Sequence, residues 1–147
     1  MAPHQFRSWL VALCLAASPA AALAADQQTA AAPAATTSVV ILKTNSTGDG
    51  VPLVYPGGTP QILSRITTFP PHSKTAVHRH PMPLYVYMLE GQLTIHTEGQ
   101  PDRHYKAGDA FMETAAWHYG ENPGDTSTRL LAVYVGADGL PLAEAKN

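Results

Sequence analysis

The chain has 147 residues, of which 45% are apolar and 14% charged, with a formal net charge of −2 at pH 7. That length fits one domain, and a small negative charge argues against recognition of nucleic acid by electrostatics. No apolar run reaches the roughly 20 residues that a membrane-spanning helix needs in the mature chain.

The N-terminal residues have the three regions of a secretory signal peptide. Arg7 is the only charged residue before Asp26, an apolar stretch follows it, and Ala22-Leu23-Ala24 has the small-x-small form of a cleavage site. We expect cleavage after Ala24, export to the periplasm or the medium, and no membrane attachment afterwards. The single cysteine, Cys14, would leave with the signal. A mature chain without cysteine has no disulfide, thiolate chemistry or zinc–sulfur site.

The rest of the chain predicts an all-β domain. Beyond a segment rich in alanine and threonine, short apolar runs alternate with glycine, proline and aspartate turn signals, and no stretch has a capped helical period. We predict strands at residues 39–43, 51–55, 61–69, 84–89, 92–97, 103–106, 110–113 and 128–135. Such spacing is typical of a β-sandwich or barrel. The predicted organisation is a signal peptide at 1–24, a flexible tether at 25–38, a β-barrel domain at 39–136 and a tail at 137–147.

Two histidines, His78 and His80, are separated by one residue. In an extended chain, residues two apart point to the same face, so these imidazoles would project side by side. Neutral imidazole is a good ligand for iron, zinc, copper and nickel. Taken alone, a His-x-His pair is interpreted more readily as two surface histidines than as metal ligands.

The stretch that begins at His78 resembles the first motif of the cupin superfamily, G-x5-H-x-H-x3,4-E-x6-G. His78 and His80 occupy its histidine positions, and Gly91 is its last glycine. In the second motif, G-x5-P-x-G-x2-H-x3-N, His118 stands at the histidine and Asn122 at the asparagine. The short separation of the motifs is similar to that in small single-domain (type-2) bacterial cupins. The resemblance implies an all-β cupin double-stranded β-helix, a small barrel or jelly roll, with a metal held by the three histidines.

The chain departs from the first motif at the glutamate that would provide a carboxylate ligand. Six residues before Gly91, the motif position is occupied by Leu84. In the second motif Thr114 replaces proline and Ala116 replaces glycine. The resemblance therefore points to three-histidine cupins, a pattern seen among thiol, diketone and gentisate dioxygenases. Three neutral imidazoles leave a divalent ion its full charge, which makes it a stronger Lewis acid with positions open for substrate or dioxygen.

Glu113 is the acid nearest to His118 in the sequence. It could act as a distant ligand, orient a histidine or serve as a catalytic base, or it could occupy a strand position that faces solvent. We expect His96 at the surface or at the rim of the pocket, His104 in solvent and Met88 in the core.

These observations predict an exported metal-dependent oxidoreductase of the dioxygenase type, acting on a small organic substrate chelated by the metal. Fe(II) is the first choice, and Mn, Zn, Cu or Ni would also suit three imidazoles. Two other hypotheses stay open, because this fold hosts many chemistries. One is a binding module that holds a small molecule or a metal without turnover. The other is a metal-dependent isomerase or lyase in which Glu113 or a tyrosine moves protons. We also expect a homodimer, with the strand at 39–43 paired to a second subunit, because exposed sheet edges need cover.

Overall fold

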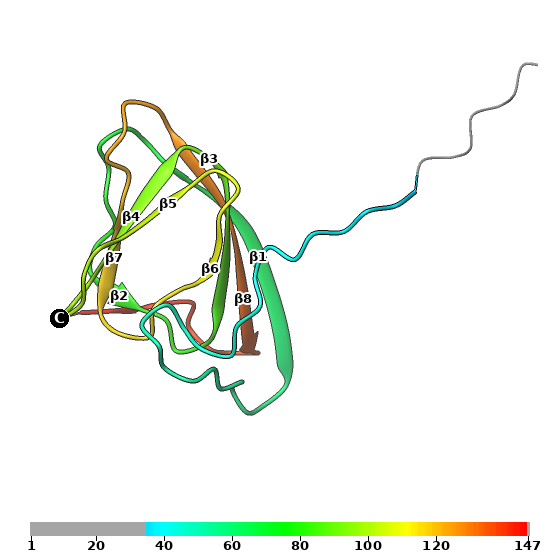
Figure 1. The fold of residues 1–147 in the computed structure, drawn as a ribbon. Helices are drawn as coiled ribbons and strands as arrows, with labels where there is room; N and C mark the ends of the chain where they lie inside the picture. The colour runs from blue at the N-terminus through cyan, green and yellow to red at the C-terminus, as the bar shows by residue number, and fades with distance from the viewer. Residues whose placement is uncertain (1–34, 147) are drawn as a thin grey trace, which may run out of the picture. The chain divides into compact units, whose positions relative to one another are not determined.

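The computed structural model describes residues 35–146, so the predicted signal peptide, its cleavage site and Cys14 lie outside the described residues. From Ser38 onward the chain forms one compact unit. No helix in the described range is long and apolar enough to cross a membrane. The regular elements there are β-strands (Figure 1): β1 (Pro60–Phe69), β2 (His78–Arg79), β3 (Leu84–Glu90), β4 (Gln92–Thr97), β5 (Arg103–Lys106), β6 (Ala110–Met112), β7 (His118–Glu121), β8 (Thr128–Ala137) and β9 (Glu144–Ala145).

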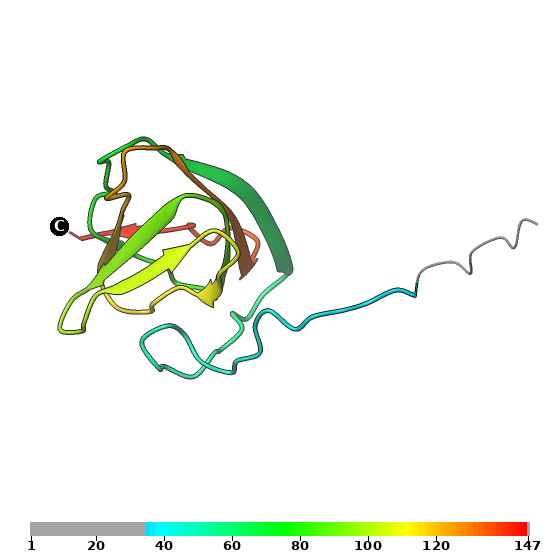
Figure 2. The same ribbon diagram turned by 45° about the horizontal axis from the view of Figure 1, so that its top comes forward.

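The strands form two antiparallel sheets that enclose a common interior (Figure 2). One sheet has the order β1-β8-β3-β6, and the other has the order β5-β4-β7-β2-β9. Strands close in sequence often lie in different sheets, so the chain winds around the interior. This is the double-stranded β-helix, and the predicted all-β fold is confirmed.

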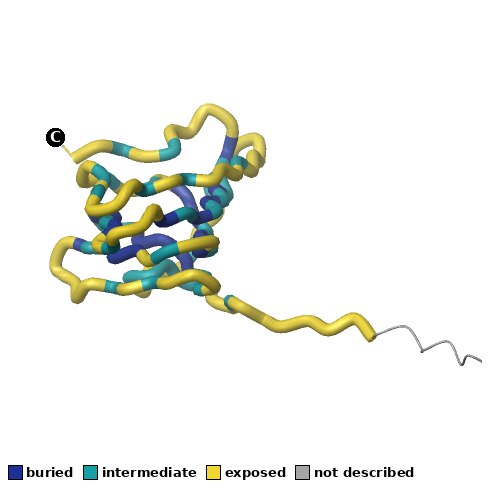
Figure 3. Tube along the Cα trace, turned by 90° about the horizontal axis from the view of Figure 1, so that it is seen from above, coloured by how far each residue is buried: buried dark blue, intermediate teal, exposed yellow. Residues whose placement is uncertain are grey.

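Alternation of side chains explains the core. Along β8 the buried residues are every second one, Leu130, Ala132 and Tyr134, because successive side chains of a strand point to opposite faces. The neighbouring β3 adds Leu84, Val86 and Met88 in the same way, which confirms Met88 as a core residue. Figure 3 shows buried segments between exposed outer stretches.

The predicted strands at 39–43 and 51–55 are wrong. Between residues 39 and 55 the structure has one isolated β-bridge, which joins Ser46 and Pro52, and no β-strand. Val39 and Val40 are 85% and 80% exposed. β-Branched residues favour strands mainly where a neighbouring strand and a buried face are available, and these have neither. The six other predicted strands match β1, β3, β4, β5, β6 and β8 with small shifts at their ends.

The three strands that the sequence did not predict, β2, β7 and β9, are short and contain mostly polar residues or glycine. Such segments carry no apolar alternation that would reveal them. They lie side by side, since β2 pairs with both β7 and β9. Residues 137–147 were predicted as a tail, and part of that segment, β9, therefore completes the sheet that carries the histidines.

Candidate metal centre

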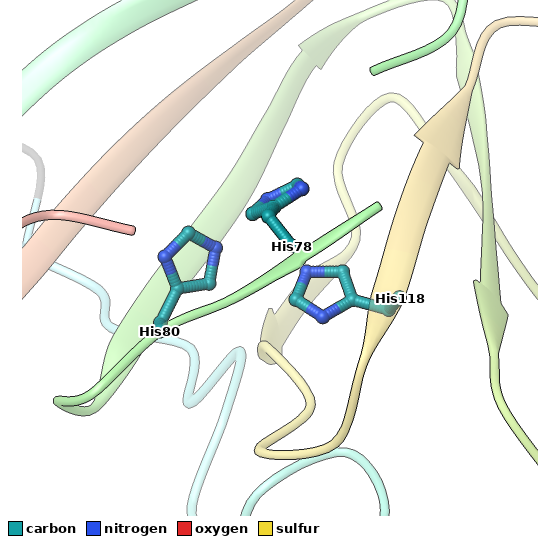
Figure 4. A group of neighbouring side chains, drawn as sticks. All are labelled: His78, His80 and His118. Atoms are coloured by element: carbon teal, nitrogen blue, oxygen red, sulfur yellow. The ribbon is translucent and has the colours of Figure 1, made fainter. Parts of the chain in front are cut away.

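Three histidines converge inside the barrel (Figure 4). His78 of β2 lies directly opposite His118 of β7 in the antiparallel register. His80 follows two residues after His78, and its ring lies with the other two around one point. One possible ligand atom from each side chain lies within 4.8 Å of the others. The structure thus brings together the three residues that the motifs selected, close enough to share one ion.

Each imidazole is oriented by a backbone carbonyl. The Nδ1 atoms of His78, His80 and His118 lie 2.8, 2.6 and 2.9 Å from the carbonyl oxygens of Ala76, Leu142 and Ala116. A carbonyl oxygen only accepts hydrogen bonds, so each Nδ1 must carry the proton. In the neutral ring the lone pair then belongs to Nε2, the state in which histidine ligates a metal.

Burial keeps these rings neutral. It lowers the pKa of all three imidazoles, although the hydrogen bond from each Nδ1 to a carbonyl opposes this effect. For His80 the pKa falls to about 4. Three uncharged imidazoles with their lone pairs available suit a divalent transition metal, so the residues fit the ion that the fold implies.

The C-terminal segment holds His80 in place. The carbonyl of Leu142 accepts the hydrogen bond from its Nδ1, and the side chain of Leu142 packs against the core. Strand β9, two residues later, pairs with β2. The sequence carried no signal for this role, because any residue could provide the carbonyl.

Asp49 holds the loop that leads to His118. Its carboxylate accepts hydrogen bonds of 3.0 Å from the backbone amides of Ala115 and Ala116, at the site where the second motif lacks its proline and glycine. Burial would raise the pKa of Asp49, but hydrogen bonds from Thr47 and Ala115 outweigh it and lower the pKa to about 2. Ala116 in turn provides the carbonyl that orients His118. The sequence indicated only a turn here.

Glu113 belongs to the site. It is 8% exposed, so the hypothesis of a solvent-facing strand position is wrong. Its Oε1 lies 3.8 Å from Nε2 of His118 and accepts a 3.0 Å hydrogen bond from the amide of Thr114. Burial raises the pKa of its carboxyl group to about 7, against the opposing effect of the Thr114 hydrogen bond. A carboxyl group in this position can give or take a proton near neutral pH.

The histidines and Glu113 line one pocket, with an empty volume of about 480 Å³ that includes its open mouth. Leu84, which stands where the first motif has its glutamate, also lines this pocket. The wall of the pocket at Leu84 is therefore apolar, as expected. Its polar lining includes Arg65 and Tyr134.

The other histidines lie apart from this pocket. His104 is exposed on β5, as expected. His96 is half-buried on β4, with its Nδ1 2.8 Å from the carboxylate of Asp102 and its ring stacked on Tyr119.

Comparison with known proteins agrees with this architecture. Residues 65–134 match the family described as Cupin domain, a stretch that contains the three histidines and Glu113. A variant of oxalate decarboxylase from Bacillus subtilis is similar at 23% identity and a TM-score of 0.50, over 57% of this chain and 23% of that chain. The DMSP lyase DddQ from Ruegeria pomeroyi is similar at 19% identity and a TM-score of 0.51, over 68% and 48%. The polyketide cyclase RemF from Streptomyces resistomycificus is similar at 17% identity and a TM-score of 0.51, over 62% and 63%.

The chain spans about a quarter of the length of the oxalate decarboxylases that it matches. At identities below 25%, these structural similarities establish the shared fold alone. The three proteins carry out different reactions, so the fold does not identify the reaction of this chain. The search of curated proteins gave no match. The fold is that of the cupins, and the reaction has to be argued from the pocket.

Proposed function

We propose that this chain, whose fold is the cupin double-stranded β-helix, is an exported enzyme that holds one divalent transition metal at His78, His80 and His118. Its reaction would be a dioxygenase-like oxidation of a small organic substrate chelated at that metal. The observation that carries the proposal is the convergence of three imidazoles whose Nδ1 atoms all face backbone carbonyls. Export rests on the sequence of residues 1–24 alone.

Fe(II) is the preferred ion, and Mn, Zn, Cu or Ni remain compatible with the ligand set. When bound, the metal would supply Lewis acidity and, as Fe(II), reactivity towards dioxygen. The residues of the chain exclude water and orient the ligands. Leu84 and Val86 keep water from one side of the pocket, and the carbonyls fix the rings so that little reorganisation accompanies binding.

The burial of Glu113 beside His118 favours a second candidate, a metal-dependent isomerase or lyase. In this case the carboxylate of Glu113 takes a proton from a carbon of the bound substrate, and the resulting acid returns it at another position or to a leaving group. A buried carboxyl group with a raised pKa is suited to that task.

Metal content is the first test. The protein is produced without an affinity tag, and its metals are measured before and after anaerobic loading with Fe(II). We expect one ion per chain in the wild type, and at least a hundredfold weaker binding in His78→Gln and His118→Gln. The matched control is His104→Gln, since His104 lies exposed outside the pocket. A folded wild-type protein that binds no divalent metal would refute the proposal.

The second test separates the reaction classes in metal-loaded protein. Oxygen uptake with candidate substrates supports the dioxygenase. Turnover without oxygen uptake, lost in Glu113→Gln, supports the isomerase or lyase. Tight binding of small molecules without turnover identifies a binding module and contradicts both enzyme proposals.

A further inference from the structure

Arg65 is exposed to solvent as a residue, and it also lines the pocket of the three histidines. Arg65 lies on β1, where its inward-facing neighbours Thr67 and Phe69 line the same pocket as the triad. Directly opposite Arg65 on β8 is Ala132, which is buried and small. An alanine at this position leaves space for the long side chain over the inner face of the sheet.

Arg65 is bound to a tyrosine that itself contacts the triad. Its Nη2 donates a 2.7 Å hydrogen bond to the hydroxyl oxygen of Tyr134, and its guanidinium carbon lies 5.2 Å from the centre of that ring. Tyr134 is 2% exposed, and its ring meets His80 edge to face at 5.7 Å. The guanidinium is thus fixed at one side of the pocket and the imidazoles at another, with the tyrosine between them.

Glu113 lines the same pocket, but Arg65 forms no ion pair with it or with any other carboxylate of residues 35–146. In the described part of the chain, the lysines and arginines that form ion pairs with carboxylates are Arg79, Lys106, Arg129 and Lys146. The bond to Tyr134 occupies only one of its five N–H donors, and a guanidinium keeps its charge at every accessible pH. An unpaired guanidinium in a pocket whose lining includes Leu84, Val86 and Leu130 favours an organic anion.

We infer that the pocket takes a small organic acid whose carboxylate is bound by Arg65 and the hydroxyl group of Tyr134, while its other end reaches the histidine triad. A carboxylate accepts two parallel hydrogen bonds from one guanidinium, and the tyrosine hydroxyl can donate a third. The inference rests on the proposed function for the metal end, and on Arg65 and Tyr134 alone for the carboxylate end.

The test compares carboxylates with the amides of the same shape. Metal binding is measured first, and calorimetric titrations of anaerobic Fe(II)-loaded protein follow with three pairs: malonate and malonamate, succinate and succinamate, 3,4-dihydroxybenzoate and its amide. Within each pair one carboxylate is replaced by a neutral group. We expect at least one acid to bind about tenfold or more tightly than its amide.

The variants assign that preference to its residues. Arg65→Met should abolish it, Arg65→Lys should retain part of it, and Tyr134→Phe should weaken it several-fold, with metal affinity unchanged in all three. The matched control is Arg129→Met, because Arg129 lies on the outer face of β8 and pairs with Glu90. Thermal melts and circular dichroism verify that each variant is folded.

Two results would overturn the inference: no acid preferred over its amide in the wild type, or a preference that survives in Arg65→Met. If the wild type binds no metal, the proposed function fails instead. The same pairs are then titrated into metal-free protein by NMR, where an Arg65-dependent preference still supports the carboxylate site and its absence refutes it.

Discussion

The backbone amide of Glu113 donates a 2.8 Å hydrogen bond to the carbonyl of Leu84. The register of β3 and β6 pairs Tyr85 with Met112, so Leu84 and Glu113 are the next cross-strand neighbours. Both line the pocket of the histidine triad. The first motif would carry its carboxylate at position 84, and here a carboxyl group reaches the same pocket from the adjacent chain segment. The pocket of the three histidines therefore contains a carboxyl group, although position 84 does not provide it.

Glu113 is expected to reduce the stability of the metal-free protein at neutral pH. Its pKa is raised to about 7 from a usual value of 4.5, so the native state holds a proton that the unfolded chain releases. The cost is absent below pH 4.5, grows as the pH rises and is complete above pH 7. Glu113→Gln should therefore stabilise the metal-free protein at pH 8 by on the order of 1–3 kcal/mol and leave it unchanged near pH 4.

Chemical denaturation of the metal-free proteins at both pH values measures this difference. Glu90→Gln is the control, since Glu90 is an exposed residue of β3 that lies outside the pocket. Equal stability of Glu113→Gln and wild type at pH 8 would show that the carboxyl group is not held in a costly environment.

Asp49 is expected to stabilise the loop before His118. Its pKa is lowered to about 2 from 3.8, so its contribution is present above pH 3.8 and disappears as the pH falls through 2. Asp49→Asn loses one of the two acceptors for the amides of Ala115 and Ala116 and should cost about 1–2 kcal/mol at pH 7. Urea denaturation at pH 7 and at pH 2.5 measures the loss, which should shrink at the lower pH. The exposed Asp138→Asn serves as control, and a loss of the same size at both values would contradict the prediction.

The C-terminal segment is expected to support metal binding. Removal of residues 141–147 deletes β9 and the carbonyl of Leu142 that orients His80. Loss of such an orienting contact typically weakens metal binding by about tenfold to a hundredfold. Calorimetry of metal binding checks this, with a thermal melt to verify folding. Glu144→Gln removes only the ion pair with Arg79 and should bind metal as the wild type does. Unchanged affinity in the shortened, folded chain would contradict the role of the carbonyl.

A homodimer remains our proposal, although the strand expected to mediate it does not form. Instead, Ile62 and Ile66 on the outer side of β1 are 65% and 55% exposed, opposite Val135 and Leu131 on β8. A second copy covering this apolar face would bury it. Light scattering after size exclusion should give twice the chain mass, and Ile62→Glu with Ile66→Glu should give a folded monomer. A wild-type chain that stays monomeric at about 100 µM has a dimer dissociation constant far above that concentration, which would refute the proposal.

The sequence by itself determined the class of fold and the three histidines. Short apolar runs such as 84–89 and 128–135, rich in β-branched and aromatic residues and separated by turn signals, are typical of an all-β domain. His78 and His80 share a face because they are two residues apart, and the second motif added His118. The predictions of strands were wrong in two opposite ways. The segments 39–43 and 51–55 have the composition of strands but no neighbouring strand to pair with. Strands β2, β7 and β9 have pairing partners but not the composition of strands.

Only the tertiary structure decided what surrounds the histidines. Glu113 enters the pocket because the register of β6 against β3 places it opposite Leu84. Arg65 and the carbonyl of Leu142 reach the site from segments far away in the chain. Such contacts depend on strand register and on how the two sheets close around the interior. Neither leaves a pattern in the local sequence. A shift of one residue in the register of β1 or β6 would turn Arg65 or Glu113 to the other face of its sheet. The sequence was sufficient to predict the three histidines that would hold a metal. The closure of the sheets decided that Glu113 and Arg65 lie in the same pocket.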